Sequence, residues 1–128
     1  MGRQKYSTEL SYSNGILTAR LSGIFNEISA ERYRKDLFSA VEELEGAPFA
    51  LLADISGVEG ATPEAFDMVK YIVNQLPSMG LSHKAYVYKG AVIKGIMFQR
   101  IPELKELEYL FFENFEEAYA FLLSKTSS

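Results

Sequence analysis

The run from Phe49 to Ala53 contains only apolar residues. It follows Pro48 and ends at Asp54. A strand made of such a run has no side for solvent, so other elements must cover both faces of its sheet. We therefore predict a central strand over 49–53, in a sheet with helices packed on it.

Turn residues and apolar spacing divide the remaining sequence into short elements. Asn14-Gly15 separates the runs Tyr6–Ser13 and Ile16–Ser22, which predicts a β-hairpin. The other expected elements are a helix over Ala30–Glu45 with Ser29 as N-cap, a helix from Thr62-Pro63 to Leu76, a strand over Ala85–Tyr88, a helix over Ala91–Ile101, a strand over Leu107–Phe112 and a helix from Asn114 to Ser124. The order ββαβαβαβα predicts an α/β fold: one domain over 1–128, with a mixed, mostly parallel sheet and about four helices.

Composition excludes several classes of function. The chain has 128 residues, no cysteine and one histidine, which removes disulfides, thiol nucleophiles and the common zinc sites. We expect neither a metal nor a cofactor. A net charge of -4 argues against nucleic-acid binding. Since no apolar run reaches the length of a membrane span and the chain starts without a secretion signal, we expect a cytoplasmic protein.

One block of the sequence departs from the acidic average. Residues 77–101 contain Lys84, Lys89, Lys94 and Arg100 and no acidic residue. Within this block, the apolar positions of the helix expected over 91–101 cover a wider arc than one core-facing stripe. We expect some of four side chains to be exposed in the monomer: Ile93, Met97, Phe98 and Ile101. Deeper burial of a short helix and a homodimer contact are the alternatives.

The expected helix over 62–76 is also broadly apolar, so the two helices could form opposite walls of a cavity. Our first hypothesis is a noncatalytic domain that binds an amphiphilic or anionic ligand, such as a lipid, and contacts the inner membrane surface. The apolar contacts would be Phe66, Val69, Ile72, Val73, Ile93, Met97 and Phe98. The basic residues Lys89, Lys94 and Arg100 would attract the head group.

Asp54-Ile55-Ser56-Gly57 follows the predicted central strand, where open α/β sheets usually place ligands. The alternative is a simple turn, in which Asp54 and Ser56 bond nearby amides. A third hypothesis is a small enzyme with Asp54 and His83 as acid and base. With one histidine and no cysteine, the chain has few other residues that could complete such an active site.

Several segments together resemble the STAS superfamily of sulfate transporters and anti-sigma factor antagonists. They are Ile16–Gly23, Pro48–Gly57, Thr62–Ala65 and Phe115–Ala118 with Phe121-Leu122. Within the superfamily, the chain is similar to the stand-alone bacterial SpoIIAA-like group, which is also likened to CRAL-TRIO lipid-transfer domains. The resemblance covers nearly the whole chain and implies the same architecture.

The resemblance also implies a second hypothesis, a regulatory module that holds a partner kinase or transporter. Its partner loop would include Asp54, Ser56, Gly57 and Thr62. In anti-sigma factor antagonists an Asp-Ser-Ser-Gly site carries the phosphorylated serine, and it falls here on Thr62-Pro63-Glu64-Ala65. Proline and glutamate take the serine positions, so this chain is not a simple phosphoswitch of that type. Thr62 is left as an acceptor or, more simply, as a helix cap.

Overall fold

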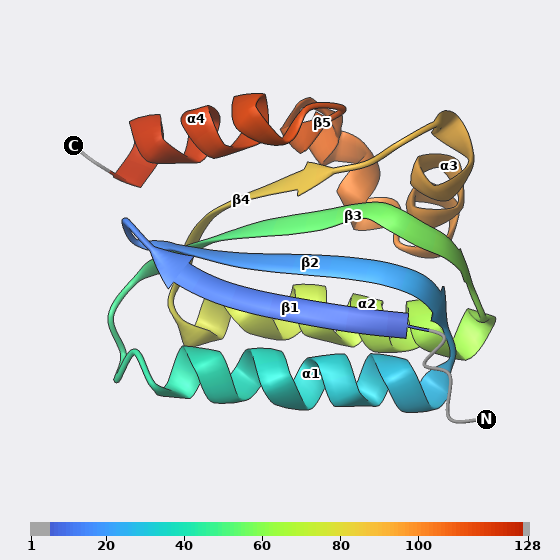
Figure 1. Cartoon of the computed structure of the whole chain (residues 1–128), viewed down its shortest axis with the longest axis horizontal. Helices are drawn as coiled ribbons and strands as arrows, with labels where there is room; N and C mark the ends of the chain where they lie inside the picture. Colours follow the sequence, from blue (N-terminus) through green and yellow to red (C-terminus); the bar gives the residue numbers. More distant parts are fainter. Residues whose placement is uncertain (1–5, 127–128) are drawn as a thin grey trace.

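The computed structural model describes residues 6–126, in which helices pack on both faces of a central sheet (Figure 1). Five strands and four α-helices alternate in the predicted order, with two 3-10 helices, η1 and η2, that the sequence analysis did not predict. The elements are β1 (Tyr6–Ser13), β2 (Ile16–Phe25), α1 (Glu27–Glu42), β3 (Phe49–Ala61), α2 (Pro63–Gln75), η1 (Leu76–Met79), β4 (Leu81–Val87), α3 (Ala91–Arg100), η2 (Pro102–Leu110), β5 (Phe111–Phe112) and α4 (Phe115–Thr126).

The strands form a single sheet in the order β1-β2-β3-β4-β5. β1 and β2 are the predicted antiparallel hairpin, and the other pairings are parallel. Helices α1 and α2 lie on one face of the sheet, and α4 lies on the other (Figure 1). The predicted fold class is confirmed.

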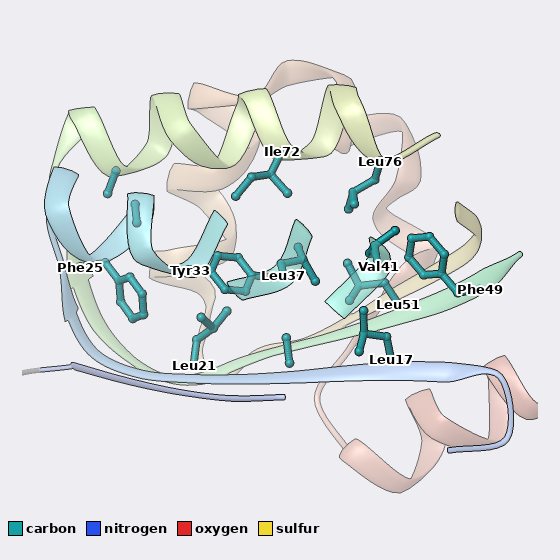
Figure 2. Close-up of a cluster of buried hydrophobic side chains, with 13 residues drawn as sticks. Leu17, Leu21, Phe25, Tyr33, Leu37, Val41, Phe49, Leu51, Ile72 and Leu76 are labelled. Atoms are coloured by element: carbon teal, nitrogen blue, oxygen red, sulfur yellow. The ribbon is translucent and has the colours of Figure 1, made fainter. Parts of the chain in front are cut away.

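The larger core lies between the sheet and the α1–α2 layer (Figure 2). On β3, Phe49 and Leu51 point into this core, where Leu37 of α1 is fully buried. On the opposite face, Ala50 and Leu52 pack against α4. The apolar run over 49–53 is thus buried on both sides, because alternate residues of a strand point to opposite faces.

Helix α1 starts three residues earlier than predicted. Asn26, not Ser29, is the N-cap: its side chain accepts a hydrogen bond from the Ser29 backbone N–H at 2.9 Å. Ser29 is the reciprocal partner, since its hydroxyl oxygen accepts from the Asn26 N–H at 2.8 Å. Both residue types make good caps, and only the backbone conformation decides between them. The helix also ends earlier, at Glu42.

The predicted strand over Leu107–Phe112 is wrong for most of its length. Only Phe111 and Phe112 pair with β4, and η2 occupies Pro102–Leu110. Leu104 and Leu110 are buried by this helical path, so the apolar pattern reflects packing of η2 rather than strand alternation. β4 spans Leu81–Val87, and thus begins four residues before the predicted Ala85.

The predicted end of the central strand is wrong as well, because β3 continues to Ala61. Its pairing with β2 shifts register twice, between Arg20 and Ser22 and again between Gly23 and Ile24. Each shift places an extra residue of β3 against β2, which is the geometry of a β-bulge. A Cβ atom at Gly57 would lie only 2.8 Å from the Ser22 Cβ, so glycine is required for this close approach.

We predict that Gly57→Ala destabilises the protein by about 1–3 kcal/mol, because the added methyl group forces β2 and β3 apart. The matched control is Gly60→Ala on the same strand, where an added Cβ meets nothing within 4 Å. Urea denaturation followed by circular dichroism measures both. Equal stability of the two variants would contradict the close approach at Gly57.

We also predict that Asn26→Ala lowers the free energy of unfolding by about 0.5–2 kcal/mol through loss of the α1 cap. Ser39→Ala is the control, since Ser39 is exposed in the last turn of the same helix, away from the N-cap. That change should be neutral or slightly stabilising, because alanine has the higher helix propensity. Denaturation midpoints for both variants test the assignment, and a larger loss at position 39 would overturn it.

Candidate functional site

Three of the predicted partner-loop residues, Asp54, Ser56 and Gly57, do not form a loop. They lie on β3, where Asp54 is buried and its Oδ1 accepts hydrogen bonds from the Ser56 N–H at 3.0 Å and the Ser56 hydroxyl at 2.6 Å. The other carboxylate oxygen lies 3.8 Å from the Arg20 guanidinium on β2. These contacts hold the first β-bulge of β3 in place. Asp54 therefore shapes the strand that leads into α2.

Thr62, the fourth of these residues, is the N-cap of α2. Its hydroxyl oxygen accepts a hydrogen bond from the Ala65 N–H at 3.2 Å, and Pro63 occupies the first turn. The Thr62 backbone N–H donates to the carbonyl oxygen of Phe25, at 2.9 Å. The end of β2 and the start of α2 are thereby joined. The prediction of Thr62 as a helix cap is confirmed.

Two exposed isoleucines lie at this same end of the sheet. Ile24, on β2, is opposite Gly60 of β3 and is 52% exposed, while Ile28, in the first turn of α1, is 72% exposed. The sequence analysis missed both residues. Ile24 follows the predicted strand over 16–22, and Ile28 precedes the predicted helix, so neither was assigned to a surface. Both side chains therefore offer apolar area to a partner at this end of the sheet.

A small apolar cavity of about 90 Å³ lies between the sheet and helices α1, α2 and α3. Six of the seven apolar residues predicted for ligand contact line it: Phe66, Val69, Ile72 and Val73 from α2, and Ile93 and Met97 from α3. Phe98 does not line the cavity. It packs edge-on against Phe111, with ring centroids 5.0 Å apart. The structure thus brings the two predicted walls together.

Two buried tyrosines that the sequence analysis did not assign to a site also line the cavity. Tyr33 comes from α1 and Tyr86 from β4. Burial raises the pKa of both phenols above the ordinary value, and for Tyr86 the nearby Tyr33 raises it further. Both hydroxyl groups therefore stay neutral at physiological pH. The only sequence signal for these two tyrosines is that each fits the apolar pattern of its element, α1 or β4.

The predicted head-group residues do not line this cavity. Lys94 pairs with Glu108 of η2 at 3.2 Å, donates to the Tyr88 hydroxyl at 3.2 Å and lies 4.6 Å from the centre of the Tyr88 ring. The hydrogen bond to Tyr88 and the contact with Glu108 raise the pKa of Lys94. Lys89 and Arg100 are exposed. The basic block of the sequence is therefore not one basic surface.

The exposed apolar surface that we expected on the helix over 91–101, now α3, is also largely absent. Met97 and Ile101 are buried, and Ile93 and Phe98 are partly buried. The reason is η2, which turns back along α3 and brings the fully buried Leu104 into the same cluster. Among the large apolar residues of α3, Val92 is the strongly exposed one, at 74%. Deeper burial, one of the alternatives, describes this helix best.

Asp54 and His83 are not placed for acid–base chemistry. His83 pairs with Ala50, four positions before Asp54 on β3, which separates the two residues by about 13 Å along the strands. Within residues 6–126, no cluster of three or more histidine, cysteine or acidic side chains could hold a metal ion. No helix in the same range is both long and apolar enough to cross a bilayer.

No protein-family model matches the chain, and neither does any curated protein sequence. Solved structures do match it. An anti-sigma factor antagonist from Mycobacterium paratuberculosis superposes with a TM-score of 0.64 at 16% identity, over 96% of this chain and 95% of that one. The Bacillus cell fate determinant SpoIIAA in its phosphorylated form gives a TM-score of 0.67 at 12% identity, over 91% of this chain and 99% of that one.

A third match is an uncharacterized protein from Shewanella loihica PV-4, of the DUF3478 family, which is described as having a SpoIIAA-like fold. Its TM-score is 0.63 at 16% identity, and the alignment covers 95% of this chain and 98% of that one. These matches agree with the resemblance seen in the sequence and in the order of strands and helices. The chain has a SpoIIAA-like fold.

Proposed function

We propose that this chain is a noncatalytic protein-interaction module, of the kind represented by anti-sigma factor antagonists. The single observation that carries the proposal is the pair of exposed isoleucines beside the N-terminus of α2, at the end of the sheet where β2 and β3 finish. The likeness to solved anti-sigma factor antagonists supports it. The partner would contact Ile24, Ile28 and the surface around Thr62.

The geometry at the end of the sheet that carries Ile24 and Ile28 favours binding without rearrangement. The bonds from Ser56 to Asp54 hold the bulge of β3, and the bond from Thr62 to Phe25 fixes the start of α2. A preformed surface loses little conformational entropy when a partner docks, so more of the contact energy becomes affinity. Binding would not depend on a phosphoserine, because Pro63 and Glu64 occupy the serine positions suggested by the resemblance.

We predict that Ile24→Ser and Ile28→Ser each weaken partner capture roughly tenfold, because exposed apolar side chains at the centre of an interface dominate binding. The measurement is quantitative affinity capture from an extract of the source organism with the folded variants. The control is Val92→Ser, whose side chain is as exposed as Ile28 but lies on α3.

A protein retained equally by wild type and both isoleucine variants would contradict this surface. Replacing Asp54, Ser56 and Thr62 by alanine tests the same end of the sheet. If one partner is captured unchanged by this triple variant, provided that it folds, the site assigned from the sequence is wrong.

The cavity supports a second candidate function, the binding of a small apolar ligand between α2 and α3. The observation in its favour is that the predicted wall residues converge on one void of about 90 Å³. Pockets for drug-sized molecules are usually about 300–1,000 Å³, so a lipid chain would need α3 to move outward. The membrane version of this hypothesis has weaker support, because Lys94 is already paired with Glu108.

We predict that xenon enters the cavity of the wild-type protein and that Ala53→Val prevents this, because the added methyl groups fill space that Ala53 borders. Ala19→Val is the matched control, since Ala19 is fully buried but does not line the cavity. NMR shifts of the Val69, Ile72 and Ile93 methyl groups under xenon pressure report binding. Identical shifts in wild type and Ala53→Val would contradict an open cavity at this place.

Native mass spectrometry of the purified protein separates the two functions. A copurified lipid or fatty acid would favour the ligand-binding candidate, and the same spectrum reports whether the protein is a monomer or a homodimer. Protein free of ligand, together with capture that depends on Ile24, would favour the interaction module.

A further inference from the structure

The edge of β4 that faces β5 is largely unpaired. β5 is only two residues long and pairs with Tyr86 and Val87, so no strand among residues 6–126 lies beside Leu81–Ala85 on that side. The chain that precedes β5 cannot supply one, because it forms η2 instead. Backbone N–H and C=O groups at an open strand edge are a template for another extended chain.

A groove of about 430 Å³ follows this edge, and we call it the β4 groove. β4 forms one side, η2 another and α4 the third. Its lining residues are Pro77, Leu81, Ser82, His83, Lys84, Leu107, Tyr109, Leu110, Phe121 and Lys125. The groove is far larger than the internal cavity and lies within the usual size range of binding sites.

The β4 groove is positively charged in an acidic protein. The chain carries a net charge of -4, yet the lining contains Lys84 and Lys125 and no carboxylate. Lys84 takes part in none of the three ion pairs among the described residues. Burial lowers the pKa of Lys84, and the field of Glu103 offsets this only in part. A half-buried ammonium group without an ion-pair partner is stabilised by an incoming carboxylate.

We propose that the β4 groove binds an extended, acidic segment of another protein, which adds to the sheet as a strand beside Leu81–Ala85. Such a segment uses all three features of the groove. Its backbone pairs with the open edge, its acidic side chains meet Lys84 and Lys125, and its apolar side chains contact Leu107 and Phe121. A small anionic amphiphile would leave the strand edge unused.

This surface is separate from the one that carries the proposed function. Ile24 lies at the carboxyl end of β2, whereas Leu81 begins β4, so the two surfaces lie at opposite ends of the parallel strands. Figure 1 shows this separation: β4 starts near the C-terminus of α4, at the end of the sheet opposite the start of α2. The inference therefore does not rest on the proposed function, and either can fail alone.

The test uses the full chain and a fluorescein-labelled octapeptide in which pairs of glutamates alternate with pairs of valines, so that each face of the added strand carries both residue types. We expect saturable binding by fluorescence anisotropy, weakened by added salt. We also expect amide NMR shifts centred on residues 81–85, 107–110 and 121–125. Two control peptides complete the design: one with lysine in place of glutamate, and one with the acidic sequence and every backbone nitrogen methylated. Neither should bind, because the first has the wrong charge and the second cannot pair with a strand edge.

Protein variants locate the site. Lys84→Gln and Lys125→Gln should each weaken binding of the acidic peptide about tenfold, as expected for loss of one charge-assisted contact. Lys105→Gln is the matched control, since Lys105 is exposed on η2 but does not line the groove. Equal binding of the N-methylated peptide, equal losses for all three lysine variants, or no saturable binding of the acidic peptide would each overturn the proposal.

Discussion

The first six residues of β3, Phe49 to Asp54, are all buried, so neither face of the central strand can meet water. Phe49 and Leu51 need the α1–α2 layer, and Ala50 and Leu52 need α4 on the opposite side. Because α4 follows β3 only after α2, β4 and α3 in the described chain, both faces of β3 are covered only when residues far apart in sequence have met. The rest of the architecture follows from this requirement to cover both faces.

A small set of contacts links β2, β3 and α4 at the point where the buried part of β3 ends. Asp54 holds the bulge in β3 through Ser56 and lies 3.8 Å from Arg20. The Arg20 guanidinium in turn lies 4.1 Å from the centre of the Phe115 ring, at the first residue of α4. An exposed cation–π contact contributes about 0.5–1 kcal/mol. These groups therefore matter more for positioning the end of the sheet than for overall stability.

Folding separates the basic residues of the block between residues 77 and 101. Lys94 is paired with Glu108 of η2, Lys84 borders the β4 groove, and Lys89 and Arg100 are exposed elsewhere. Charges that are adjacent in sequence are thus divided among different environments. The acidic partner of Lys94, Glu108, comes from the segment that follows this block. Both surfaces that we propose for binding therefore differ from the basic and apolar patch that the sequence predicted.

The sequence by itself determined the order of the elements, the buried central strand, the hairpin at Asn14-Gly15 and the capping of α2 by Thr62. These follow from local rules of spacing, turn geometry and capping, which act over a few residues. Tertiary structure alone decided the burial of Met97 and Ile101, the shortness of β5 and the bulged continuation of β3. Each depends on which distant segment packs alongside, since burial and strand pairing belong to pairs of elements and not to one stretch of chain.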